Sequence, residues 1–299
     1  MPFRKELPVD FTTARGVQEA LELGVTSAQL RNPELHAPFR GVRVMGELRH
    51  VHELAESYRS LLPMDGAFSH STAARLHGMP LPWRESGLPV HVTIPRPGRA
   101  RQGRGVIGHS RQLSAHEIIV SRGLPLTSVE RTWCDLAAML TLPELVAAAD
   151  HLLWFRAPKT SPAALQAAVE AFRGRRGLPA LRAALPLLSD RSQSSPETML
   201  RLSIQFSHLP PVRANFEHRL STGRVVFLDL AFEVFQVGLE YEGDHHRTDV
   251  EQWRSDVRRI EELTAEGWRM MRVTATDVRD MPLLISRIEA RLRQAGWDG

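Results

Sequence analysis

A chain of 299 residues, 42% apolar and 24% charged, has the length and the balance of an ordinary globular protein with two or three cored domains. Its lone cysteine, Cys134, excludes a disulfide within the chain. Because the sequence has no signal-like apolar segment at its start and no apolar run of bilayer length, we expect a cytoplasmic protein that does not contact a membrane.

Residues 1–50 predict a winged helix-turn-helix module. The pattern is helical from 12 to about 35 and contains a short second helix, "VTSAQLRN", which Thr26 or Ser27 can cap. The segment "FRGVRVMG" at 39–46 then alternates as a β-wing does. In this motif the second helix enters the major groove of DNA. A three-helix packing module without a role in DNA binding fits the same pattern. The predicted DNA-contacting residues are Gln29, Arg31, Arg40 and Arg43.

Residues 51–155 predict a small α+β domain. "GAFSHSTAARLHGMPLP" is typical of a capped helix that ends at Gly78, "LPVHVTIP" of a strand, and "LTSVERTWCDLAAML" of an amphipathic helix. Four histidines of this block have no metal-ligand spacing, so we interpret them as structural or surface residues. They are His70, His77, His91 and His109.

The basic residues are almost all arginine, since Lys5 and Lys159 are the only lysines. A guanidinium group can bind phosphate oxygens bidentately, so clusters such as "RPGRARQGR" at 96–104 could form a phosphate-binding surface. A GC-rich genome produces the same bias through its codons. Composition therefore leaves both explanations open.

The stretch "FSHSTAARLHG" followed by "GLPLTSVERTWCDLA" resembles the N-terminal region of actinobacterial proteins related to AbiEi-family antitoxins of abortive-infection systems. The resemblance covers about the first half of the chain. It implies a winged-helix DNA-binding module joined to a second small domain, with DNA and a cognate toxin or regulatory protein as partners. By itself it implies no catalysis.

Residues 156–190 predict a helical linker, and residues 191–299 predict an α/β layer domain. A helix begins at Ser195-Pro196, and three strands follow in "RANFEHRL", "VVFLDLAF" and "VGLEYEG". Thr248 and Glu251 form a capping box for the next helix, which precedes the strand "WRMMRVT" and a last amphipathic helix. The predicted order is α-β-β-β-α-β-α.

Acidic residues and histidines crowd the end of an apolar strand in "LDLAFEVFQVGLEYEGDHH", residues 228–246. Because strand side chains alternate, Glu240 and Glu242 share one face, and Asp229 on the neighbouring strand can point to the same side. Converging carboxylates repel and raise one another's pKa unless a cation lies between them. Hard oxygen ligands suit Mg²⁺ or Mn²⁺, ions that activate water and stabilise the charge of a phosphodiester. A solvated strand face with a polar turn gives the same pattern.

The segment from "FLDLAFEVFQVGLEYEGDHH" to "GWRMMRVTATDV" closely resembles an actinobacterial domain related to very-short-patch-repair endonucleases, of the PD-(D/E)xK nuclease superfamily. The resemblance implies an α-β-β-β-α-β core in which Asp229 and Glu240 bind the metal. It also implies that Glu197 holds a second ion or a metal-bound water. The predicted site also includes Tyr241 as a metal-binding position, together with His246, Asp256 and Arg259.

Two departures concern catalysis. Glu242 occupies the position of the superfamily lysine, and no lysine follows Lys159. We expect His245 or His246 to orient or deprotonate the water, because imidazole can do so near neutral pH. Arg259 could stabilise phosphate charge, but it cannot act as a base.

The sequence therefore predicts an endonuclease that hydrolyses DNA with Mg²⁺ or Mn²⁺ and carries an N-terminal DNA-binding module. The alternative is a non-catalytic, antitoxin-like transcriptional regulator. The acids favour the enzyme, and the missing lysine favours the regulator. An RNA-directed nuclease is a third option.

Overall fold

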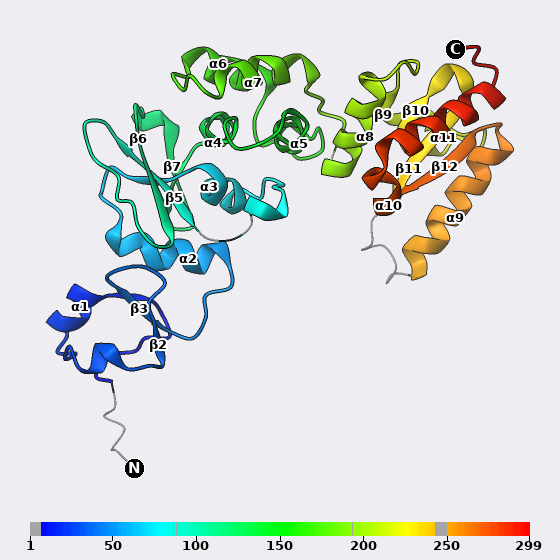
Figure 1. Ribbon diagram of the computed structural model, residues 1–299. Coiled ribbons are helices and arrows are strands. Elements are labelled where there is room, and N and C mark those ends of the chain that lie inside the picture. The colour runs from blue at the N-terminus through cyan, green and yellow to red at the C-terminus, as the bar shows by residue number, and fades with distance from the viewer. Residues whose placement is uncertain (1–6, 86, 88, 193, 243–249) are drawn as a thin grey trace. The chain divides into compact units, whose positions relative to one another are not determined.

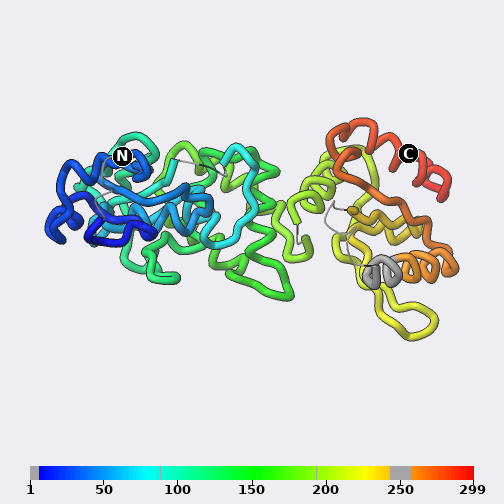
Figure 2. Tube along the Cα trace, turned by 90° about the horizontal axis from the view of Figure 1, so that it is seen from below, coloured from blue at the N-terminus to red at the C-terminus, as the bar shows by residue number. Residues whose placement is uncertain are grey.

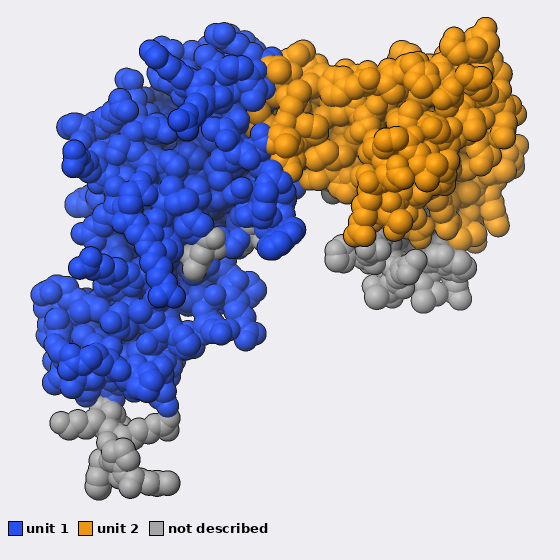
Figure 3. Space-filling view, viewed as in Figure 1, with its two compact units in different colours: residues 1–140, 163–182 blue, residues 141–162, 183–299 orange. Residues whose placement is uncertain are grey.

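The computed structural model describes residues 7–85, 87, 89–192, 194–242 and 250–299, with the backbone alone over 250–256. The chain forms two compact units (Figure 3). The first comprises residues 1–140 and 163–182, and the second comprises residues 141–162 and 183–299. Each unit combines helices with sheet, which confirms the predicted mixed α/β class. Within the described residues, every helix is too short or too polar to cross a bilayer.

The first unit begins with a small three-stranded sheet in the order β1-β3-β2 (Figure 1). Segment 39–46 supplies one strand, β3, and its hairpin partner is β2, with Leu35 opposite Met45. Helix α1 follows β1 and packs Ala20 into an apolar core with Phe11 and its neighbours. The bounds are β1 Arg15–Gly16, α1 Val17–Glu22, β2 Leu35–His36 and β3 Val42–Met45.

The second helix predicted over 25–32 is shorter than expected, a single 3-10 turn (η1, Gln29–Arg31). The N-cap of this turn is Ala28, which makes no side-chain cap bond, and the predicted Thr26 contributes instead through its hydroxyl, which accepts the N–H of Gln29. The turn ends because Pro33 follows Asn32, and a proline disfavours helical backbone at the residue before it. Asn32 is accordingly non-helical, with ψ of 128°.

A five-stranded sheet in the order β6-β5-β4-β8-β7 forms the rest of the first unit, with helices packed on it. The pairs β5–β6 and β4–β8 are parallel, and the pairs β4–β5 and β7–β8 are antiparallel. The predicted strand at 88–95 and the predicted helices around His70 and Trp133 are confirmed as β5, α3 and α4. The strand bounds are β4 Ala67–Phe68, β5 Val90–Pro95, β6 Val106–Arg111, β7 Ile118–Ser121 and β8 Leu124–Thr127. The helix bounds are α2 Val51–Tyr58, α3 His70–Leu76, α4 Val129–Leu136, α6 Pro162–Ala171 and α7 Leu178–Ala184.

The second unit has a four-stranded sheet in the order β12-β11-β10-β9, in which β11 and β12 are parallel and the other pairs are antiparallel. The predicted order α-β-β-β-α-β-α is confirmed, with a short extra helix, α10, before the last one. The strands are β9 Arg213–Arg219, β10 Val225–Phe232, β11 Val237–Glu242 and β12 Arg269–Thr274. The helices are α5 Leu142–Leu153, α8 Ser195–Gln205, α9 Val250–Ala265, α10 Ala275–Arg279 and α11 Met281–Gln294.

Helices cover both faces of this sheet (Figures 1 and 2). On one face, α8 and α11 pack on an apolar cluster that includes Leu230, Leu239 and Ile288. On the other face, α9 packs Leu263 against Leu228 and Trp268. The acids of β10 and β11 therefore lie in a sheet that is shielded on both sides.

Candidate functional site

Asp229 lies at a kink that β9 and β10 share. Leu228 packs on the α9 side of the sheet, whereas Leu230 packs on the side of α8 and α11. Residues two apart in a regular strand share a face, so β10 changes face at this level. The register of β9 on β10 places Asn215 opposite Asp229, and Asn215 has a left-handed φ of 43°. Both strands therefore depart from regular geometry at the predicted acid.

The Asp229 carboxylate also joins β10 to β11. Its Oδ2 accepts the backbone N–H of Tyr241 at 2.8 Å. The antiparallel register of β10 on β11 ends at the pair Leu230–Leu239, and the bond to the Tyr241 N–H brings Asp229 beside the next residues of β11, Glu240 and Tyr241. The two predicted metal ligands thus lie at the same level of neighbouring strands.

Glu240 is almost fully buried, with 9% of its surface exposed, and it forms a two-pronged ion pair with Arg259. Arg259 Nη1 and Nη2 donate to Glu240 Oε1 and Oε2 at 3.1 and 2.7 Å. Nη1 also donates to the carbonyl of Phe227 at 2.6 Å. Because a buried carboxylate is costly without a counter-charge, the guanidinium group compensates Glu240 and ties α9 to both acid-bearing strands.

The remaining predicted acids, Glu197 and Glu242, are less deeply buried than Glu240. Glu197 lies in the first turn of α8, where its Oε1 accepts the Ser194 hydroxyl at 2.6 Å. Glu242 is at the end of β11, half-exposed, with Arg272 Nη1 at 3.9 Å. The ring of Tyr241 packs against the apolar cluster below α11. Predicted residues His245 and His246 lie outside the described residues, as does the side chain of Asp256.

A surface cavity of about 560 Å³ opens beside β9 and is lined by residues from three segments, 186–191, α8 and 212–217. Its wall includes Arg191 and Arg213, and Asn215. The buried Asn215 Nδ2 has no hydrogen-bond partner among the described residues. Arg191 and Arg213 carry the guanidinium donors of this cavity, which lies one strand away from Asp229, and they form exposed ion pairs with Asp190 and Glu233.

The four predicted DNA-contacting residues divide into two kinds. Arg31 and Arg40 are exposed. Arg43 is half-buried, and its guanidinium donates to the carbonyls of Leu30 and Val42 at 3.0 and 2.9 Å. The Gln29 side chain accepts the N–H and hydroxyl of Thr26, so it is part of the turn. Arg43 and Gln29 hold the module together, and Arg31 and Arg40 project from it.

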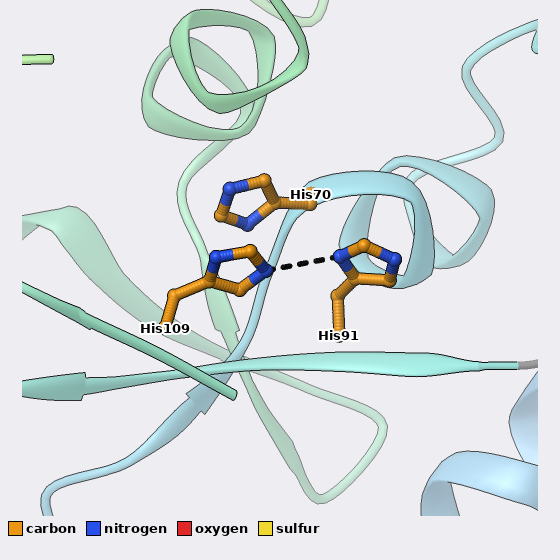
Figure 4. A group of neighbouring side chains, drawn as sticks. All are labelled: His70, His91 and His109. Carbon is orange, nitrogen blue, oxygen red and sulfur yellow. Dashed lines mark hydrogen bonds between the residues drawn. The ribbon is translucent and has the colours of Figure 1, made fainter. Parts of the chain in front are cut away.

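Three histidines that are far apart in the sequence lie close together in the first unit. His70 begins α3, His91 lies on β5 and His109 lies on β6 (Figure 4). One ring nitrogen from each lies within 4.8 Å of those of the other two. Among the described residues, this is the one group of three histidine, cysteine or acidic side chains close enough to hold a metal ion together. The sequence did not predict that these three lie together; of the two roles expected for them, a surface role does not fit the buried His70 and His91, and a structural role stays open. The parallel pairing of β5 with β6 unites His91 and His109, and no spacing rule along the chain reports it.

No protein-family model matches the chain. The uncharacterized proteins MT2308 and Rv2248, from two strains of Mycobacterium tuberculosis, are each 28% identical to it over 229 residues, which span 76% of this chain and 82% of the relative. Among solved structures, the RV2827C protein of Mycobacterium tuberculosis aligns with 60% of this chain and 73% of its own, at 15% identity and a TM-score of 0.42. These comparisons assign no activity to the site.

Proposed function

We propose that the chain is a metal-dependent DNA endonuclease of the PD-(D/E)xK type, with its chemistry in the second unit and an antitoxin-like DNA-binding module at the start of the first. The observation that carries the proposal is that the Asp229 carboxylate bonds the Tyr241 N–H, directly after the buried Glu240, at a kink in a sheet covered on both faces. A strand that merely presents a solvated polar face would not bury Glu240 to 9% exposure.

The donor set fits a hard divalent cation. Asp229 and Glu240 would hold Mg²⁺ or Mn²⁺, with Glu197 and the Tyr241 position as further candidates, because carboxylate oxygens are the preferred ligands of these ions. A carboxylate oxygen has more than one lone pair, so the bonds to Tyr241 and Arg259 leave both acids acceptor capacity. When bound, the ion lowers the pKa of a water and offsets phosphate charge.

The chain's own residues supply orientation and charge. Arg259 fixes both oxygens of Glu240 and brings a permanent positive charge to the acids. Arg191 and Arg213, at the cavity beside β9, are suited to hold the phosphates of a DNA strand next to Asp229. We assign the orientation or deprotonation of the attacking water to His245 or His246, because Glu242 occupies the position of the superfamily lysine.

The test is cleavage by the purified full chain. Double-stranded DNA, single-stranded DNA and RNA are incubated with Mg²⁺, Mn²⁺ or a chelator, and we expect metal-dependent cleavage of DNA. Asp229→Asn keeps an oxygen for the Tyr241 N–H but removes the charge. It should lower the cleavage rate by more than about 100-fold, beyond the usual effect of changing an outer-shell partner. The matched control is Asp298→Asn, an exposed acid far along the chain, which should cleave normally.

One observation favours the alternative, a non-catalytic DNA-binding regulator. Both oxygens of Glu240 already have a cationic partner in Arg259, so the buried acid is stable without an ion. If the unmodified chain shows neither metal-dependent cleavage nor Mg²⁺ or Mn²⁺ binding by calorimetry, the nuclease proposal fails. Salt-sensitive DNA binding without cleavage would then support the regulator.

A further inference from the structure

The three histidines of the first unit face one another in a buried polar cluster (Figure 4). A hydrogen bond of 3.0 Å joins His91 Nδ1 and His109 Nε2. The rings of His70 and His109 are stacked with centroids 3.7 Å apart. His70 and His91 are only 7% and 6% exposed. Two of the three imidazoles are therefore buried and the third, His109, is half-buried against them, an arrangement that apolar side chains would fill at lower cost.

The electrostatics of the cluster keep these rings neutral. Burial lowers the pKa of His91 to about 4. Burial, with His91 and Arg111 nearby, lowers the pKa of His109 to about 4. Burial likewise brings the pKa of His70 well below its ordinary value. Neutral imidazole, with a lone pair on one ring nitrogen, is the form that binds a metal ion, so no proton need be displaced at neutral pH.

A carboxylate stands behind the cluster. Asp135 Oδ2 lies 4.0 Å from His70 Nδ1, is buried, and has no hydrogen-bond partner among the described residues, while Oδ1 accepts from Arg131 Nε at 3.1 Å. The Ser69 hydroxyl is 2.9 Å from the same His70 nitrogen and accepts a hydrogen bond from Thr93. Metal-binding histidines commonly direct their second nitrogen to such a carboxylate.

The backbone also holds His70 in place. Its φ of 50° is in the left-handed region, which is uncommon for a residue other than glycine. Such a conformation persists only where the surroundings impose it, and it gathers at functional positions. Here it directs the first side chain of α3 toward β5 and β6.

We propose that His70, His91 and His109 together bind one divalent transition-metal ion, with Zn²⁺ as the representative, and that Asp135 and Ser69 orient His70. Imidazole nitrogens suit Zn²⁺, Ni²⁺ and Cu²⁺ and are poor ligands for Mg²⁺, so this site is separate in chemistry from the acids of the second unit. Three histidines are enough protein ligands for a tetrahedral ion whose remaining position is taken by water or another small ligand. The ion would tie α3 to β5 and β6. The inference does not depend on the proposed nuclease function.

The experiment measures Zn²⁺ binding to the full chain after treatment with a chelator and its removal. Calorimetry should give one Zn²⁺ per chain, and His91→Gln and His109→Gln should each weaken binding by at least about 100-fold. The matched control is His36→Gln, an exposed histidine on β2, which should leave the affinity unchanged. Equal weakening in the control, or unchanged affinity in both cluster variants, would overturn the proposal.

Two measurements on the unmodified chain keep the proposal testable if a cluster variant fails to fold. Co²⁺ should produce the strong visible absorption of a tetrahedral site, and Zn²⁺ should remove it. A hundredfold excess of free Zn²⁺ over its dissociation constant should raise the melting temperature by about 5 °C or more. If Co²⁺ gives only the weak spectrum of the hydrated ion and Zn²⁺ does not shift melting, the three histidines are a metal-free packing cluster.

Discussion

Asp229 and Arg259 show how single side chains hold the second unit's strands in an irregular arrangement. Asp229 takes a strand N–H that a regular ladder would give to a backbone carbonyl, and Arg259 spans from α9 to Phe227 and Glu240. The sequence predicted that the acids lie on adjacent strands, because alternation and strand order are local signals. It could not predict the pairing of Glu240 with Arg259, because that contact depends on how α9 packs on the sheet.

Arg259→Ala should lower the free energy of unfolding by about 3–5 kcal/mol, since it leaves the buried Glu240 carboxylate without its counter-charge. Urea titration of the full chain provides the measurement. Arg272→Ala is the control, because Arg272 and Glu242 are 3.9 Å apart and about half-exposed, and it should cost less than about 1 kcal/mol. Similar losses from both would mean that Glu240 gains little from Arg259.

The histidine cluster predicts the pH dependence of the metal-free chain. His91 and His109 have an unfolded pKa near 6.5 and a folded pKa of about 4, so the unfolded chain binds more protons between these values. Stability from the cluster is therefore present above pH 6.5 and is lost as the pH falls toward 4. Burial raises the pKa of Asp135 to about 6, which acts in the opposite sense below pH 6. Since three histidines oppose one acid, melting temperature in chelator should fall between pH 7 and pH 5, and a flat or rising profile would contradict this.

At the scale of helices and strands, elements with local signals were predictable and elements shaped by their surroundings were not. The order of the second unit's elements followed from caps, alternation and turns. The turn η1 fell short because Pro33 follows it. Helix α10 did have a local signal, the capping box of Thr274 and Asp277 directly after β12, but the predicted order did not include it. The histidine cluster escaped because it depends on a parallel pair, β5 and β6, and on the first residue of α3.

In the N-terminal module, substitutions of the exposed arginines should affect DNA binding, and substitution of the half-buried Arg43 should affect stability. Replacing Arg31 and Arg40 by alanine should weaken DNA binding and reduce the slope of log affinity against log salt by about 2, because each phosphate contact releases about one counterion. Arg43→Ala should instead lower the melting temperature, since it removes the bonds to Leu30 and Val42. Fluorescence anisotropy over a salt series and thermal melting report the two effects. DNA binding that is independent of salt would exclude this module as the contact surface.

At the scale of the whole molecule, the two units are not consecutive in the sequence. Helix α5 belongs to the second unit, the following segment 163–182 belongs to the first, and the chain then returns. Asp150 explains why α5 belongs to the second unit. It is fully buried and accepts hydrogen bonds from Thr198 and Arg201 of α8. The domain start predicted near Arg191 rests on the local pattern of helices and a polar turn, and such a pattern does not report a buried pair with α5.

A fragment of residues 191–299 should therefore be much less stable than one of residues 141–299. The shorter fragment leaves Arg201 without Asp150 and uncovers the face of α8 that packs on α5. Comparing their urea transitions by circular dichroism tests this expectation. Equal midpoints would show that α5 contributes nothing to the stability of α8 and the sheet.

The parallel pairing of β5 with β6 has a consequence for the order of events during folding. His91 and His109 approach only after a crossover connection has closed and the two strands have aligned, which is slower than forming a local hairpin or helix. In small zinc domains the ion nucleates a chain that is otherwise unfolded. Here the sheet is shaped by its own apolar core, with Phe68, Val92 and Leu126 at its centre. An ion would therefore arrive late, and it would slow the unfolding of a finished sheet without accelerating its assembly.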